Sequence, residues 1–278
     1  MPAGSPAFVP AHLRRTILRM AYRGSTVHIA CAFSLVEILA VLYRNHLKLG
    51  DQPDDPQRDY LILSKGHGVM AQYACLLEKG WLSEDKIEAY CSDGTELKGL
   101  SETGVPGLEV NSGSLGHGLA VGAGLALGAL RRGTAQRVYA IVGDGECNEG
   151  SIWETLLFAA HFRLTNLLVI VDANGYQAMG RTVEILNTES LEEKFKAFGF
   201  EARTVDGHNE AVLDKTISEL VGSLFSGPRA IIARTFKGKG ISFMENSNLW
   251  HYSRLTEETY KAGLIELDNL NPGEPSII

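Results

Sequence analysis

The sequence has few cysteines, and their spacing points to neither a metal site nor a disulfide framework. Its 278 residues include only Cys31, Cys75, Cys91 and Cys147, none of which forms the close pairs typical of zinc binding. All four stand in segments expected to form regular secondary structure. We therefore expect reduced thiols and a cytoplasmic protein.

Signals for secretion, membrane insertion and nucleic-acid binding are also missing. Pro2, Pro6 and Pro10 occupy the segment where a signal peptide needs an apolar run. The longest apolar stretch, residues 119–130, is too short to span a bilayer and is interrupted by glycine. The formal net charge is −7 and the two signs are mixed along the chain, so no basic face is expected for a nucleic-acid backbone. We expect neither a membrane nor a nucleic-acid partner.

Hydrophobic residues make up 45% of the sequence, and their pattern is that of an α/β protein with a full core. Short β-branched runs alternate with amphipathic stretches, which predicts parallel strands joined by helices. The predicted strands are 60–63, 137–142, 167–172, 201–205 and 229–234. The predicted helices lie near 11–22, 34–46, 68–79, 83–91, 149–162, 190–197 and 209–223.

These elements predict the α/β fold class: a doubly wound, mostly parallel sheet with helices on both faces. We expect a single domain over residues 9–267. The segments 1–8 and 268–278 are rich in proline, glycine or asparagine and should form loose tails.

A Gly-Asp-Gly turn follows the strand 137–142. Gly143 and Gly145 permit a sharp turn that presents the Asp144 carboxylate beyond the sheet, although such a turn could be purely structural. Asn174 follows the next strand and should emerge beside Asp144. A carboxylate, an amide oxygen and a backbone carbonyl suit Mg²⁺, which completes its shell with phosphate oxygens. The spacing therefore favours a metal-bridged diphosphate.

The segment 64–68, Ser-Lys-Gly-His-Gly, follows the strand 60–63 and should open a helix. Free backbone N–H groups at a helix start favour an anion, and His67 can add a donor to a phosphate oxygen. His67 could instead only cap the helix. The position of this segment beside the other strand ends favours a ligand contact.

The motif from Gly143 to Asn174 resembles the thiamine-diphosphate motif. The stretch 143–182 is similar to the N-terminal subunits of split, two-component transketolases over nearly its whole length. The resemblance implies thiamine diphosphate and Mg²⁺ as cofactors, with the metal held by Asp144, Asn174 and the Tyr176 carbonyl. The cofactor-binding residues implied are His67, Ser114, Leu115, Gly116, Gly143, Asp144, Gly145, Glu146, Asn174 and Tyr176.

Residues 113–118, Gly-Ser-Leu-Gly-His-Gly, are predicted to open a helix of small residues. Glycine costs up to ~1 kcal/mol at a helical position, so several glycines indicate close backbone approach. Most of this helix should simply pack tightly against its neighbours. The resemblance implies that its first turn, with Ser114, Leu115 and Gly116, lies against the diphosphate and thiazolium.

The resemblance implies four catalytic residues: His28, His67, His251 and Glu149. His28 would face the reacting carbons and move protons, though alone it could be a buried core histidine. His251 matches a later cofactor-facing histidine, although its Leu-Trp-His-Tyr context departs from the family's Trp-His-Gly. Glu149 matches a glutamate that links two active sites across the subunit interface, and could instead be a solvated helix-start residue.

The family binds its cofactor between two domains, and the second domain supplies a glutamate that activates the aminopyrimidine. Only residues 235–278 follow the last predicted strand, too few for that domain. We therefore expect a C-terminal, pyrimidine-binding partner subunit, most simply in an α₂β₂ assembly. Together they would transfer a two-carbon ketol unit from a ketose, as a sugar or sugar phosphate, to an aldehyde acceptor.

Two segments bear on the substrate. Lys98-Gly99-Leu100-Ser101 stands where the family usually carries Gly-His-Pro, so Leu100 would replace a histidine that contacts the donor sugar, or could pack into the core. Loss of such a hydrogen bond costs ~1–3 kcal/mol, which would disfavour the usual pentulose donor. The segment 237–240, Lys-Gly-Lys-Gly, could be a solvated turn or a ligand contact.

Two other functions remain open. A 2-oxo acid dehydrogenase E1α-type subunit shares the cofactor motif but passes an acyl group, or in a hybrid a ketol group, to a lipoyl or acyl carrier. The segments 64–68, 113–118 and 236–246 resemble transketolases, and this resemblance argues against an E1α-type subunit. A non-catalytic assembly subunit is disfavoured because Asp144 and Asn174, together with His28 and His67, are all present.

Overall fold

The structure, a computed structural model, describes residues 7–270 and is built on one five-stranded parallel sheet. The strands lie in the order β1-β2-β3-β7-β6, and all four pairings between neighbours are parallel. Their bounds are β1 Tyr60–Leu63, β2 Val138–Gly143, β3 Leu167–Ala173, β6 Glu201–Asp206 and β7 Arg229–Arg234. All five strands predicted from the sequence are confirmed, with ends that move by at most one residue.

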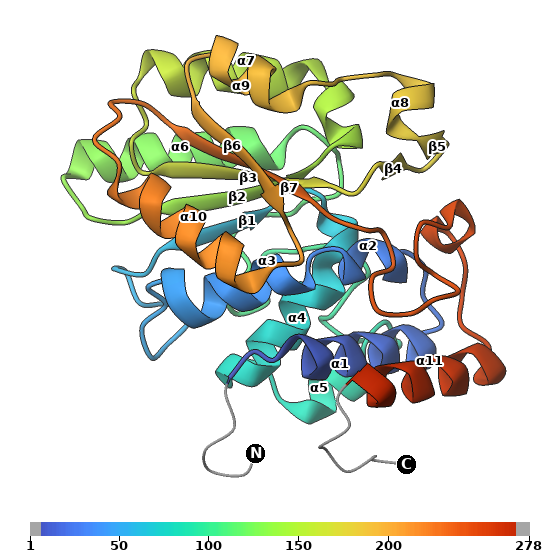
Figure 1. The fold of residues 1–278 in the computed structure, drawn as a ribbon. Helices are drawn as coiled ribbons and strands as arrows, with labels where there is room; N and C mark the ends of the chain where they lie inside the picture. Colours follow the sequence, from blue (N-terminus) through green and yellow to red (C-terminus); the bar gives the residue numbers. More distant parts are fainter. Residues whose placement is uncertain (1–6, 271–278) are drawn as a thin grey trace.

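Helices cover both faces of the sheet, as the doubly wound prediction requires (Figure 1). α6 (Gly118–Arg132), α7 (Gly150–His161) and α9 (Leu191–Ala197) lie on one face. α3 (Val36–Val41), its continuation η1 (Leu42–His46) and α10 (Glu210–Gly222) lie on the other. Side chains along β2 alternate between the two hydrophobic clusters that result: Val138, Ala140 and Val142 join one, Tyr139 and Ile141 the other.

A further layer of helices packs behind α3. It contains α1 (Pro10–Arg23), α4 (Val69–Lys79), α5 (Glu84–Glu88) and α11 (Glu257–Leu270), and α1 contacts both α4 and α11. α11 was not predicted from the sequence. No helix of the described residues is long and apolar enough to cross a membrane.

The predicted tails need correction. Phe8 is buried and its ring lies 5.5 Å from that of Tyr43, because an apolar side chain next to α1 can still enter the core. At the other end, residues 268–270 form the last turn of α11 and do not belong to a loose tail. The remaining parts of the predicted tails, 1–6 and 271–278, lie outside the described residues.

The predicted helix start at residues 113–118 also needs correction. α6 begins at Gly118, so Ser114, Leu115 and Gly116 lie in the loop before it. Gly113 (φ 132°) and Gly116 (φ 83°) adopt positive φ angles that no α-helix accommodates, which explains the later start. Tight packing holds for part of the helix: a Cβ on Gly118 would lie 2.7 Å from the Ser64 backbone, whereas one on Gly124 would meet nothing.

Several short elements escaped prediction, and most of them lie near the carboxyl end of the sheet. They are α2 (Ile29–Phe33), η2 (Gly66–Gly68), η3 (Gly145–Asn148), β4 (Tyr176–Gln177), β5 (Gly180–Arg181), α8 (Thr182–Ile185) and η4 (Asn248–His251). Periodicity cannot reveal elements of two to five residues, because they contain less than two full turns or strand repeats.

Candidate functional site

Candidate site residues follow the carboxyl ends of four neighbouring strands. β1, β2, β3 and β7 are adjacent and parallel, so the segments that follow them meet at one edge of the sheet. These segments carry His67, Asp144, Asn174 and Lys237, respectively. The fold therefore brings the sequence motifs together.

Asp144 and Asn174 lie side by side, both buried. The Asp144 carboxylate accepts hydrogen bonds from the backbone N–H groups of Gly145 (2.8 Å) and Gly175 (2.7 Å), and the second bond joins the turn after β2 to that after β3. Asn174 donates through Nδ2 to Asp172 (3.1 Å) and accepts at Oδ1 from the Tyr176 N–H (3.0 Å). Backbone N–H groups thus hold the side chains of two of the three predicted metal ligands, Asp144 and Asn174.

Asp172, the residue two before Asn174, joins the segments around this pair. It is fully buried and accepts hydrogen bonds from Ser34 Oγ (2.7 Å), Lys65 Nζ (2.5 Å) and Thr235 Oγ1. Burial alone would raise the pKa of the Asp172 carboxyl, but the Lys65 charge and the hydrogen bonds from Lys65, Ser34 and Thr235 together lower that pKa. One carboxylate therefore connects the segments around α3, β1, β3 and β7.

The charge around Asp144 suits a cation. Burial and the neighbouring Asp172 carboxylate raise the pKa of Asp144 to about 6, so a positive charge beside it would favour the ionised form. Among the described residues, no group of three or more His, Cys, Asp or Glu side chains is arranged to hold a metal ion. A metal at Asp144 would need the Asn174 amide, a backbone carbonyl and ligand oxygens, the donor set that suits Mg²⁺.

The buried Glu146 side chain connects three of the sequence motifs, those that contain Ser64, Gly116 and Gly143. Its carboxylate accepts hydrogen bonds from Ser64 Oγ (2.5 Å) and from the backbone N–H groups of Gly116 (2.8 Å) and Gly143 (3.0 Å). The carboxylate is buried, and these bonds use both of its oxygens. Glu146 thus holds the loop before α6 against the turn after β2, and its contact with the cofactor stays a prediction.

His28, His67 and His251 form a cluster at the other end of the site. Ring centroids lie 5.3 Å apart for His28 and His67, 5.3 Å for His28 and His251, and 6.0 Å for His67 and His251. His28 has a left-handed backbone conformation (φ 67°) immediately before α2, which is unusual for a residue with a side chain. The core-histidine alternative does not fit, because His28 is only partly buried.

The histidines are neutral in this environment. Burial and the Lys237 charge lower the pKa of His251 to about 3 and lower that of His28. The pKa of His67 falls well below its usual range through burial and the nearby Lys65 ammonium. Neutral imidazoles offer one donor and one acceptor each, as general acid–base chemistry requires.

Lys237 was missed as a site residue. Its side chain is fully buried, and its Nζ lies 2.6 Å from His251 Nδ1 and 5.7 Å from the centre of the Tyr176 ring. The solvated-turn alternative is therefore wrong for Lys237, whereas the side chain of Lys239 is partly exposed. One hint was present in the sequence, because Lys237 follows β7 at the same edge as the other motifs.

The other predicted residues lie at the rim. Ser114 and Glu149 are exposed and Leu115 is partly buried. Leu100 is 43% exposed and its side chain lies against Gly113, so the alternative that it packs into the core is wrong. Its position next to the loop that carries Ser114 leaves the predicted role at the donor sugar untested.

The fold and this edge of the sheet define an α/β domain of the thiamine-diphosphate-binding class. The family profile described as "Transketolase, thiamine diphosphate binding domain" matches residues 20–272. The chain belongs to the transketolase family and corresponds to the N-terminal, cofactor-binding part. This finding confirms the resemblance read from the motifs.

Curated relatives and solved structures agree. The chain is 39% identical to a subunit of the apulose-4-phosphate transketolase from Actinobacillus succinogenes, over 86% of this chain and 87% of that relative. It is 37% identical to a 6-deoxy-6-sulfo-D-fructose transketolase subunit from Clostridium sp., over 87% and 88%. Transketolase from Campylobacter jejuni has the same fold (TM-score 0.86, 28% identity), covering 93% of this chain but only 42% of that one.

Proposed function

We propose that this chain is the cofactor-binding subunit of a two-component transketolase, which transfers a two-carbon ketol unit from a ketose to an aldehyde acceptor. The observation that carries the proposal is the meeting of Asp144, Asn174 and the three-histidine cluster at one edge of the sheet. The two nearby relatives are named as transketolase subunits, and whole transketolases such as that of Campylobacter jejuni are more than twice as long.

The proposed cofactor is thiamine diphosphate with Mg²⁺, which when bound supplies the electron sink for cleavage of a carbon–carbon bond next to a carbonyl. Asp144, Asn174 and the Tyr176 carbonyl would hold the metal. The His67 ring would bind the diphosphate, whereas the N–H groups of Gly66 and Gly68 already donate to the carbonyls of Ser64 and Lys65. The buried Lys65 ammonium is paired with the Asp172 carboxylate. Lys237, whose pKa is lowered by burial, would add positive charge that favours an anion at this edge of the sheet when it is protonated.

The neutral histidines would move protons. His28 and His251 lie edge to face, so a substrate hydroxyl placed beside them would meet one ring nitrogen that donates and one that accepts. Lys237 orients His251: an ammonium group has no acceptor, so it donates to Nδ1 and leaves the proton of the neutral ring on Nε2. The partner subunit would supply the remaining contacts, in an α₂β₂ assembly, and Glu149 would lie at the interface.

The donor is proposed to differ from the usual pentulose, because Leu100 stands where a sugar-binding histidine is expected. The two relatives act, by name, on apulose 4-phosphate and on a sulfonated deoxyfructose, which are uncommon sugars. An apolar side chain at this position would favour a donor without a hydroxyl to bond there.

The test is reconstitution. The chain should show no turnover alone with thiamine diphosphate, Mg²⁺ and a panel of ketose phosphates, and should gain it when a pyrimidine-binding subunit is added. The product distinguishes the reaction: a longer ketose formed from an aldehyde supports ketol transfer, whereas an acylated carrier indicates an E1α-type subunit. Full activity of the chain alone would contradict the two-component proposal, and no metal-dependent cofactor binding in the assembly would indicate an assembly subunit.

A further inference from the structure

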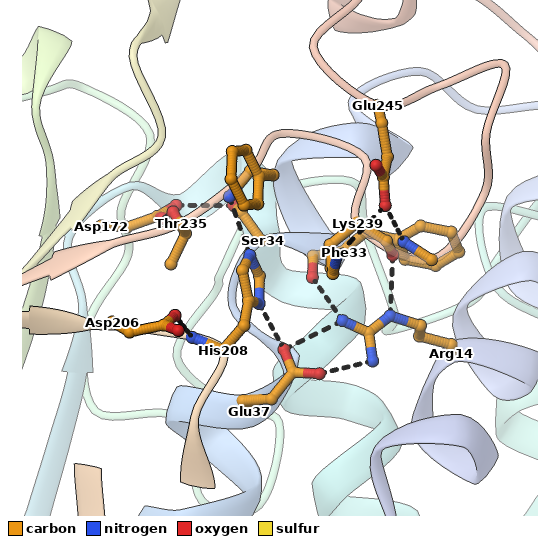
Figure 2. Close-up of polar contacts among 12 residues, drawn as sticks. Arg14, Phe33, Ser34, Glu37, Asp172, Asp206, His208, Thr235, Lys239 and Glu245 are labelled. Carbon is orange, nitrogen blue, oxygen red and sulfur yellow. Dashed lines mark hydrogen bonds and ion pairs between the residues drawn. The ribbon is translucent and has the colours of Figure 1, made fainter. Parts of the chain in front are cut away.

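A buried polar network contacts the segment that follows β7. It consists of Arg14 on α1, Glu37 on α3 and His208 in the turn between β6 and α10 (Figure 2). None of these residues belongs to the motifs described above. Their side chains are 6–9% exposed, so the network is desolvated and its charges act strongly on one another.

The protonation of His208 follows from its partners. Burial alone would raise the pKa of Glu37, but the Arg14 charge and the His208 hydrogen bond lower it to about 2, so Glu37 is ionised. His208 Nδ1 lies 2.8 Å from Glu37 Oε2 and must therefore carry a proton to donate. Its Nε2 accepts a 2.7 Å hydrogen bond from the backbone N–H of Phe236 and cannot carry one. His208 is thus the neutral Nδ1–H tautomer.

Both ends of the network hold the segment that delivers Lys237. His208 accepts from the N–H of Phe236, whose ring stacks on the imidazole with centroids 5.7 Å apart. Arg14 Nε donates to the Lys239 carbonyl (2.8 Å) while its guanidinium forms a bidentate pair with Glu37 (2.7 and 2.9 Å). The backbone on either side of Lys237 is therefore fixed by the same three side chains.

The turn that carries His208 is itself rigid. The His208 N–H donates to Asp206 (2.9 Å), and the neighbouring Gly207 N–H donates to the carbonyl of Arg234, the last residue of β7 (2.7 Å). Asn209 caps the first turn of α10 through Val212 N–H (3.1 Å). These bonds hold the turn that carries the imidazole against the end of β7 and the start of α10.

We propose that His208 is a positioning residue for the active site: with Glu37 and Arg14 it fixes residues 236–239, and thereby sets the 2.6 Å contact between Lys237 and His251. His208 acts only through the Phe236 backbone and Lys237, since it contacts none of the three clustered histidines in the described structure. This inference rests on the proposed function for its effect on turnover, but its effect on His251 can be measured in the chain itself.

Two substitutions separate the two hydrogen bonds of His208. His208→Asn can place an amide N–H near the former Nδ1 and keep the bond to Glu37, but offers nothing to Phe236. His208→Gln can place its carbonyl oxygen near the former Nε2 and keep the bond from Phe236. In the complete enzyme we expect kcat to fall about 10–100-fold for His208→Asn, the range typical of residues that orient ligands from behind, and less than about threefold for His208→Gln.

A matched control distinguishes positioning from stability. His46 also pairs with a carboxylate, Asp214 (2.9 Å), but lies in η1 away from the site. His46→Asn should lower the melting temperature as much as His208→Asn and leave kcat unchanged. Equal losses of kcat in His46→Asn and His208→Asn, or in His208→Asn and His208→Gln, would contradict the proposal.

The route through Lys237 is tested by a double-mutant cycle. In a Lys237→Met background, His208→Asn should change the remaining activity less than about twofold, because the residue it positions is gone. An undiminished effect would overturn the proposed route.

A readout independent of turnover separates this inference from the proposed function. In the ¹⁵N-labelled chain, His208→Asn should shift the His251 ring nitrogens away from the single Nε2–H tautomer, and His208→Gln should not. Unchanged His251 signals in His208→Asn would overturn the inference even in an active enzyme. A wild-type assembly without turnover would contradict the proposed function and leave this measurement valid.

Discussion

The candidate site has two ends that are built in different ways: one around Asp144 and Asn174, here called the metal end, and one around the three histidines, here called the histidine end. At the metal end, Asp144 and Asn174 are held by backbone N–H groups of residues one to thirty-odd positions away, in turns after adjacent strands. At the histidine end, His28, His67 and His251 come from three separate segments, and Lys237 reaches them from a fourth. The first end depends on local backbone geometry, the second on packing between distant elements.

This difference has consequences for robustness. Backbone hydrogen bonds at the metal end persist when most neighbouring side chains change, because the turns themselves provide them. The histidine end relies on side chains such as Glu37 and His208, which a single substitution can remove. Changes at the metal end should therefore affect binding, whereas changes at the histidine end should affect stability, proton transfer or specificity.

The largest effect is expected at the metal end. Asp144→Ala removes the only carboxylate predicted to bind the metal, and should lower Mg²⁺-dependent affinity for thiamine diphosphate by more than about 100-fold, since even outer-shell residues cost 10–100-fold. Calorimetric titration of the assembly measures it. Asp51→Ala, an exposed carboxylate, is the control. Retained binding in Asp144→Ala would refute the metal assignment.

A lower free energy of unfolding is expected when the Arg14–Glu37 pair, which supports the histidine end, is broken. Glu37→Gln leaves the Arg14 guanidinium buried without its counter-charge, which typically costs about 3–5 kcal/mol. The free energy of unfolding at pH 7, from urea denaturation, should fall by that order. A change below about 1 kcal/mol would show that the pair contributes little to the support of the histidine end.

The same pair predicts a pH dependence. The folded-state pKa of Glu37, about 2, lies below its usual value of 4.5, so the ionised form stabilises the fold above pH 4.5. This contribution, on the order of 3 kcal/mol, is lost as the pH falls from 4.5 towards 2. Between these pH values the wild type should lose more stability than Glu37→Gln, as measured by denaturation at each pH. Parallel curves would contradict the assigned shift.

A smaller, local effect is expected within the histidine cluster. Burial and then the Lys237 charge lower the pKa of His251 to about 3, so Lys237→Met should raise it, though not to the usual 6.5 because burial remains. NMR titration of the His251 ring measures the shift. If the pKa does not rise, Lys237 is not the charge that keeps His251 neutral.

The smallest effect is expected at the rim. Leu100→His should restore a partner for a donor hydroxyl and improve kcat/KM for a pentulose phosphate by about fivefold, corresponding to roughly 1 kcal/mol. Leu100→Met, which keeps the apolar surface, is the control. Equal donor preference in both variants would indicate that Leu100 does not face the sugar.

The strands, and the meeting of Asp144 with the turn that carries Asn174, could be predicted well from the sequence, because the information there is local. The strands β1, β2, β3 and β7 contain short apolar runs, whereas β6 is mostly polar. The motifs stand directly after strands whose parallel pairing brings their ends together. The positive φ angles of Gly113 and Gly116 were harder to see, and the start of α6 was accordingly misplaced. Glycine permits both a helix and such a loop, so composition alone could not decide.

The sequence by itself thus determined the family and the parallel sheet, and it named the residues proposed to hold a metal and a diphosphate. Only the tertiary structure decided that Asp172 joins four segments, that Lys237 is buried against His251, and that His208 stands behind it. Such contacts join residues far apart in the chain, and their charges depend on burial and neighbours that no local pattern encodes.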